Sequence, residues 1–163
     1  MSWTGRQLRS TIDTNGNLDL TLDDVDAGDP ADDEIVVRIE ATPINPSDLG
    51  LLLGPADLAT MTKPDAGGPG RDRPSRDRPG LRFTVPAERL ARVAGRLGQS
   101  MPVGNEGAGT VVAAGREAQA LLGKRVGMIG GAMYADYRRI RAADVVALPD
   151  GATAADGASM FVN

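Results

Sequence analysis

The chain contains neither cysteine nor histidine. Without cysteine it can form no disulfide and carry out no thiol redox chemistry, which fits the reducing cytoplasm. Zinc sites in proteins are built from thiolate, imidazole and carboxylate, so two of the three usual ligand types are missing. The sequence therefore predicts a protein that holds no metal, either at a catalytic site or at a structural one.

Long apolar runs and an excess of basic residues are also absent. No apolar run reaches the roughly 18 residues of a membrane-spanning helix, and the first six residues lack the apolar stretch of a signal peptide. The 22 acidic residues outnumber the 18 basic ones, whereas nucleic-acid binding requires a clustered positive charge. We therefore expect a cytoplasmic protein whose partner is a small molecule, with no nucleic acid and no membrane.

Aromatic residues are scarce and glycine is abundant. Only 3% of the 163 residues are aromatic, while 21 are glycine. This balance suits a β-rich fold whose backbone turns often and approaches ligands closely. The length fits a single domain with a core of its own.

The first part of the chain shows the alternation of half-buried strands. Apolar and polar residues alternate over 18–23 and again over 34–41. Asn15-Gly16 predicts a two-residue type I′ hairpin turn that pairs 8–13 with 18–23. An acidic loop over 24–33 is expected to separate this hairpin from the next strand.

The second part predicts short strands followed by a helix. Strands are expected over 107–114, 124–129, 132–140 and 145–148, a spacing typical of a barrel or sandwich. A helix is expected from Thr153 onward, because Thr153 can cap it and Asp156 falls in its first turn.

No unit for holding a dinucleotide is evident. A pyrophosphate site needs a strand, a G-x-G-x-x-G turn and a helix in that order. The nearest approach, Gly107-Ala108-Gly109, precedes a valine-rich strand instead of following one.

The middle of the chain holds an unusual stretch. Residues 64–80 consist almost only of Pro, Gly, Arg and Asp and cannot bury enough apolar surface to fold alone. They are either a basic loop that meets phosphate groups or a solvated surface loop, and mixed-sign, proline-rich runs favour the second. Residues 86–97 have the apolar spacing of one amphipathic helix, interpreted as a lid packed on its own domain.

Two segments, Ile44–Asp48 and Gly104–Gly109, resemble the active-site edges of the catalytic domain in medium-chain dehydrogenases and reductases. In the zinc alcohol dehydrogenases of that superfamily, these edges carry a Cys ligand and a His-Glu pair. The matching positions here are Asn45, Asn105 and Glu106. The resemblance therefore points to the zinc-free branch, similar to quinone oxidoreductases and enoyl-thioester reductases, in which NADPH delivers hydride to an activated double bond.

This resemblance implies a mainly β fold, a GroES-like partly open barrel with a few short helices, without the Rossmann domain. Residues 1–150 would form the catalytic domain, with an insertion at about 55–100, and 151–163 would begin the helix that links it to a nucleotide-binding domain. NADPH is then expected for the complete enzyme and is not expected to bind tightly to this chain alone. A stand-alone, non-catalytic binding barrel is the alternative, and a homo-oligomer is left open.

The resemblance also assigns roles to individual residues. Asn105 would donate to the substrate carbonyl oxygen, where negative charge grows during hydride addition. Enoyl reductases often place a Tyr directly after the first segment; 49–55 contains none, so Tyr134 is the candidate proton donor and Tyr137 a core residue. Glu106 is expected behind the loop in a structural role. The residues assigned to substrate or cofactor are Asn45, Ser47, Asp48 and Asn163; Asn45 could equally be a turn residue, and Ser47 and Asp48 could cap a helix over 49–53.

Overall fold

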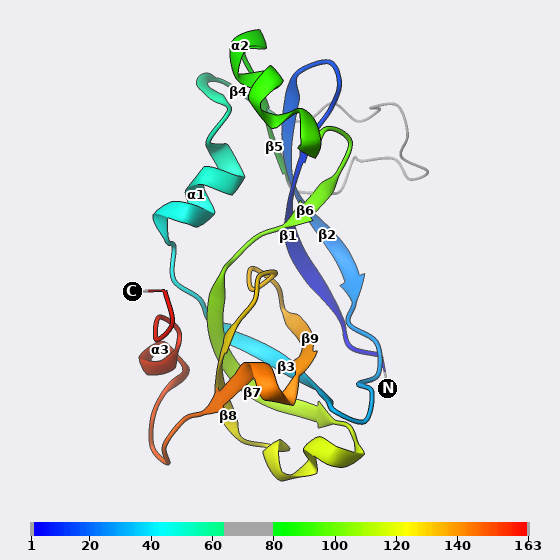
Figure 1. The fold of residues 1–163 in the computed structure, drawn as a ribbon, viewed down its shortest axis with the longest axis vertical. Helices are drawn as coiled ribbons and strands as arrows, with labels where there is room; N and C mark the ends of the chain where they lie inside the picture. Colours follow the sequence, from blue (N-terminus) through cyan, green and yellow to red (C-terminus); the bar gives the residue numbers. More distant parts are fainter. Residues whose placement is uncertain (1, 64–79, 163) are drawn as a thin grey trace.

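The protein is built on two antiparallel sheets of five strands each, and Figure 1 shows their arrangement in the computed structural model. The structure describes residues 2–63 and 80–162. One sheet has the order β4-β5-β2-β1-β6 and the other β10-β8-β7-β3-β9, which confirms the mainly β prediction. The strands of the first sheet are β1 (Thr4–Ile12), β2 (Asn17–Asp26), β4 (Asp57–Thr62), β5 (Gly80–Thr84) and β6 (Ser100–Pro102); those of the second are β3 (Glu34–Ala41), β7 (Glu106–Ala114), β8 (Arg125–Ile129), β9 (Tyr137–Arg141) and β10 (Val145–Ala147).

The helices are short. Besides α1 (Pro46–Leu53) there are α2 (Ala87–Leu90) and α3 (Ala154–Gly157), with the 3₁₀ turns η2 (Ala91–Arg96), η3 (Arg116–Leu121) and η4 (Ala142–Asp144). In the described ranges, none of the helices has both the length and the apolar character needed to cross a membrane.

The first hairpin forms where expected but with a different turn. β1 and β2 pair from Thr4↔Asp26 to Ile12↔Leu18. Of the two central turn residues, only Gly16 has a positive φ, of 82°. Its N–H donates to the Asp13 carbonyl at 3.2 Å. The turn is therefore the longer kind that ends in one left-handed glycine, and the type I′ prediction is wrong.

Two hydrophobic clusters lie against the two sheets. The first joins β1, β2 and β5 to α1 through Ile12, Leu18, Phe83 and Leu52. The second lies inside the other sheet and is completed by η3; it contains Ile35, Val37, Val111, Ala118, Val126, Met128, Met133 and Ile140. Except for Leu52, Phe83 and Ala118, these residues come from segments predicted as strands, because burial of one face of each strand drives the sheets together.

The sheets meet where β1 passes the segment before β9. Leu8 N–H donates to the Tyr134 carbonyl at 2.8 Å, and Asp136 N–H donates to the Arg6 carbonyl at 2.9 Å. The strand predicted over 132–140 begins only at Tyr137, so the early part of that prediction is wrong. Gly130, Gly131 and Ala132 have φ of 125°, 84° and 64°, and three such residues in a row cannot continue an extended strand.

The insertion contributes two strands and two short helices. Its strands β4 and β5 extend the first sheet, which the sequence did not indicate. The single helix expected over 86–97 is interrupted at Val93, whose φ and ψ angles are not helical. Leu90, Val93 and Leu97 still pack on the first cluster, so the segment packs on its own domain as expected, while its role as a lid stays a prediction. The prediction that 64–80 form a basic or a solvated loop concerns mostly residues 64–79, which lie outside the described residues.

The C-terminal helix begins as expected and ends early. Thr153 caps α3 and Asp156 supplies its reciprocal bond, but the regular helix covers only four residues. A helix running from 153 to the end is therefore wrong, and turns follow α3 up to Val162.

Candidate functional site

The segments 44–48 and 104–109 lie side by side, linked by hydrogen bonds between buried groups. The first opens α1, with extended Asn45 as its N-cap and Pro46 as its first helical residue, where a missing N–H costs nothing. In the second, Gly104 has a φ of 99°. A Cβ on Gly104 would lie 2.7 Å from the Tyr134 nitrogen, so only glycine fits this approach.

Asp48 is the centre of the first half of the network. Its side chain is buried, and three groups donate to it: Asn45 N–H at 3.1 Å, Asn105 N–H at 3.0 Å and the Tyr134 hydroxyl at 3.1 Å. Because one donor comes from each neighbouring segment, the carboxylate holds α1, the 104–109 turn and the segment before β9 together. Of the two roles offered for Asp48, the geometry favours helix capping, since the side chain accepts from Asn45 N–H at the start of α1 and is only 1% exposed.

Glu106 is the centre of the second half and has no solvent exposure. Oε1 accepts from Asn45 Nδ2 at 3.0 Å, and Oε2 accepts from the N–H groups of Phe161 and Val162 at 2.9 and 3.1 Å. A buried carboxylate without a cationic partner needs several such donors. Glu106 thereby ties the start of α1 to the turns after α3.

This donor set does not fit zinc. Every group aimed at the Glu106 carboxylate carries a hydrogen, and a cation would meet these N–H dipoles at their positive ends. The flanking side chains are amides, which are not usual zinc ligands.

Asn105 and Ser47 form the part of the network that reaches solvent. Asn105 Nδ2 donates to Ser47 Oγ at 2.7 Å, and Ser47 is exposed. The Asn105 carbonyl accepts from Gly130 N–H at 3.1 Å, which fixes its backbone. Within the described ranges, the second hydrogen of the Asn105 amide has no protein partner.

Several exposed apolar residues lie on the segments that adjoin this polar pair. Ile44 is 72% exposed, and it directly precedes Asn45. Ile129, 41% exposed, pairs with Glu106 across β7 and β8. Other large apolar residues exposed on the adjoining segments are Leu49, Met160 and Val162. One amide donor among apolar side chains suits a ligand with a single carbonyl on an apolar body.

Tyr134 lies within the network and is half-buried. Its single hydroxyl hydrogen is shared between two acceptors, Asp48 Oδ2 at 3.1 Å and the Pro43 carbonyl oxygen at 3.0 Å. Burial and the neighbouring Asp48 carboxylate raise the pKa of Tyr134 to about 12. An efficient general acid has a pKa near the working pH, so this geometry favours a role in holding Asp48 over a role as proton donor.

The remaining predicted residues are placed as follows. Asn45 is 3% exposed, with its amide committed to Glu106. Tyr137 is half-buried and contacts Trp3, their ring centroids 5.8 Å apart. Asn163 lies outside the described residues. Nothing in the sequence predicted the backbone donors of Phe161 and Val162, or the support of Asn105 by Gly130 N–H.

Solved structures of reductases share this architecture. The chain aligns over 98% of its length with a protein described as an NADPH:quinone reductase from Mesorhizobium loti, at 22% identity and a TM-score of 0.58. A protein with the same description from Bacillus thuringiensis aligns over 98% at 21% identity and a TM-score of 0.61. The CurK enoyl reductase aligns over 97% at 16% identity, also with a TM-score of 0.61.

The alignments cover only part of the other proteins. The chain spans 40%, 38% and 39% of the lengths of these three structures. No protein-family model matches the sequence, and the search of curated proteins found no relative. At these identities the comparisons show the fold alone, and it agrees with the mainly β, GroES-like fold that the resemblance of the two segments implied.

Proposed function

We propose that this chain is the substrate-binding half of an NADPH-dependent oxidoreductase that reduces a quinone or another activated double bond. The observation that carries the proposal is the joining of the two segments by Asp48 and Glu106. They fix the partly exposed Asn105 beside Ser47, on segments that also carry the exposed apolar residues Ile44 and Ile129. The fold shared with quinone and enoyl reductases agrees with it.

Asn105 is proposed to bind the carbonyl oxygen of the substrate. Bound NADPH would supply the hydride, and the carbonyl oxygen would gain negative charge as the conjugated carbon is reduced. The free hydrogen of the Asn105 amide is held ready for this oxygen, because Ser47 fixes the side chain and Asp48 fixes the backbone. A donor fixed in advance costs no reorganisation during the reaction.

The residues present fit only one end of the cofactor. The exposed Ser47 hydroxyl and Asn105 amide can contact the nicotinamide side, whereas Asp48 and Asn45 are buried and cannot. No strand, glycine-rich turn and helix of the phosphate-binding type occurs in the described ranges. We therefore propose that a Rossmann domain completes the enzyme, and that the chain alone is inactive.

Binding of a carbonyl ligand tests the assigned residue on this chain directly. Titration with 1,4-naphthoquinone, followed by ¹⁵N NMR, is expected to shift the side-chain amide of Asn105 and the backbone amide of Ser47. Asn105→Ala should abolish the shifts at Ser47. Gln99→Ala, which removes another surface amide with its own bond to Gly95, should leave them unchanged.

Shifts that survive Asn105→Ala would place quinone binding elsewhere and refute the role of this residue. A defined oligomer with no response to quinone or NADPH would instead favour the alternative, a non-catalytic interaction barrel.

A further inference from the structure

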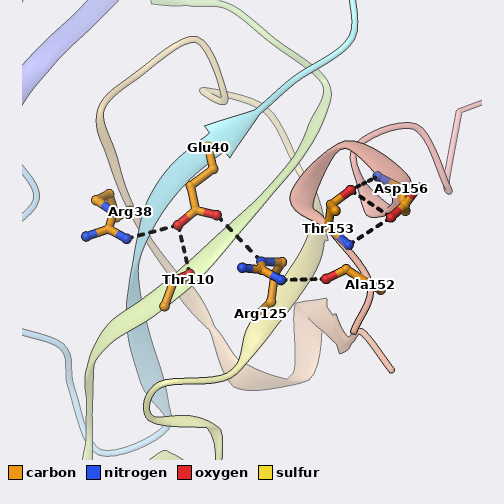
Figure 2. Close-up of polar contacts among 7 residues, drawn as sticks. All are labelled: Arg38, Glu40, Thr110, Arg125, Ala152, Thr153 and Asp156. Atoms are coloured by element: carbon orange, nitrogen blue, oxygen red, sulfur yellow. Dashed lines mark hydrogen bonds and ion pairs between the residues drawn. The ribbon is translucent and has the colours of Figure 1, made fainter. Parts of the chain in front are cut away.

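A charged cluster on the outer face of the second sheet contacts the C-terminal segment (Figure 2). Glu40 on β3 accepts from Arg38 at 3.0 Å and from the Thr110 hydroxyl at 2.8 Å. The other Glu40 oxygen lies 3.6 Å from Arg125 Nε on β8. The Glu40 side chain is 27% exposed, so these contacts are only partly screened by water.

Arg125 connects this cluster to the segment that follows β10. Its Nη1 donates to the Ala152 carbonyl, as Figure 2 shows. Ala152 directly precedes Thr153, whose side chain accepts from Asp156 N–H at 3.3 Å. Thr153 N–H donates in turn to the Asp156 carboxylate at 2.8 Å. Arg125 therefore holds the residue before the helix cap, which sets where α3 begins.

α3 transmits this placement to Glu106. Ala154 and Ala158 pack on Ala108 of β7, and the turns after α3 supply the two N–H groups bound to Glu106 Oε2. β8 and α3 also pack closely, since a Cβ on Gly127 of β8 would lie 3.1 Å from the Gly157 carbonyl oxygen.

We propose that Glu40 and Arg125 are positioning residues for the Glu106 network. They form a latch (Glu40, Arg125 and the Ala152 carbonyl) that holds 152–162 against the sheet and keeps the Phe161 and Val162 N–H groups on Glu106. The latch acts on Glu106 through α3. The proposal is independent of the proposed reaction, because none of these contacts includes Asn105 or a substrate.

Amide hydrogen exchange measured by NMR on the purified chain tests this latch. Arg125→Met keeps the apolar stem and removes the guanidinium. We expect exchange at Phe161 and Val162 to rise about tenfold, the effect of losing one charge-assisted hydrogen bond. Glu40→Gln should raise it less, by about threefold, since Gln can still accept from Thr110. Amides in the centre of β3 and β7 should change less than about twofold for both variants.

Arg38→Met is the matched control. It removes another partner of the same carboxylate without touching Ala152, so exchange at Phe161 and Val162 should stay near the wild-type value. Equal acceleration at every amide in Arg125→Met would show general destabilisation and overturn the proposal. Unprotected Phe161 and Val162 amides in the wild type would overturn it as well.

Discussion

Replacing Asn45 by Asp tests the buried contact between the two segments. In the wild type, Asn45 Nδ2 lies 3.0 Å from Glu106 Oε1. Asn45→Asp would place two carboxylates at this distance with almost no solvent, and like charges so close cannot both be ionised. One carboxyl group must therefore bind a proton in the folded protein, and its pKa must rise above the pH of the experiment.

The cost follows from the proton that must be bound. Carboxyl groups ordinarily titrate near pH 4, so protonating one at pH 7 costs about 4 kcal/mol. The hydrogen bond between the acid and its partner returns about 1 kcal/mol, which leaves a loss of about 3 kcal/mol. At pH 5 the loss falls to about 0.5 kcal/mol. A carboxyl group whose pKa is raised in the folded state stabilises the fold at low pH, and this contribution is lost as the pH rises. The variant is therefore less destabilised at pH 5 than at pH 7.

Urea unfolding followed by far-UV circular dichroism, at pH 7 and pH 5, gives the free energy of unfolding. Adding Glu106→Gln should recover most of the loss at pH 7. The Gln amide can donate to the new carboxylate, while its oxygen still accepts from the Phe161 and Val162 N–H groups. A loss below about 1 kcal/mol at pH 7, or no recovery in the double variant, would refute the contact.

Two further outcomes are expected from the structure. Because Tyr134 has its pKa raised to about 12 by burial and by Asp48, stability should fall as the pH rises from about 10 towards 12; Tyr134→Phe should weaken this dependence in alkaline unfolding curves, and an unchanged curve would argue against the shift. Gly109→Ala would put a Cβ 2.0 Å from the Arg38 carbonyl oxygen and should cost more than about 3 kcal/mol, whereas Gly50→Ala, with open space on α1, should stabilise by about 0.5–1 kcal/mol in thermal melts; equal effects would contradict the packing described.

The strands with clear alternation could be predicted from the sequence. β3 has the predicted bounds of 34–41, and β7 and β8 each begin within one residue of those expected. Period-two burial explains this success, because one face of each strand fills the core. The strand predicted over 132–140 failed at its start. The positive φ angles of Gly130–Ala132 prevent an extended backbone there, and these small residues form no apolar pattern that would have shown it.

Much of the site could be predicted for a different reason. The segments 44–48 and 104–109 were placed together by their resemblance to a known catalytic domain, and the structure brings them into contact. The backbone donors of Phe161 and Val162 could not be predicted, because an N–H group is the same in every residue except proline. The commitment of Tyr134 to Asp48 likewise depends on the path of the chain before β9.

The strongest test of the proposed function is turnover by the protein joined to a dinucleotide-binding domain. Loss of NADPH absorbance would be followed with a quinone and, separately, with a 2-enoyl thioester, for the wild type and for Asn105→Ala. We expect the wild type to turn over at least one of the two substrates. In Asn105→Ala, kcat should fall by about 10²–10³, the usual effect of removing one hydrogen-bond donor to a developing oxyanion. Gln99→Ala should match the wild type. Full activity of Asn105→Ala would contradict the assignment of Asn105 as the carbonyl donor.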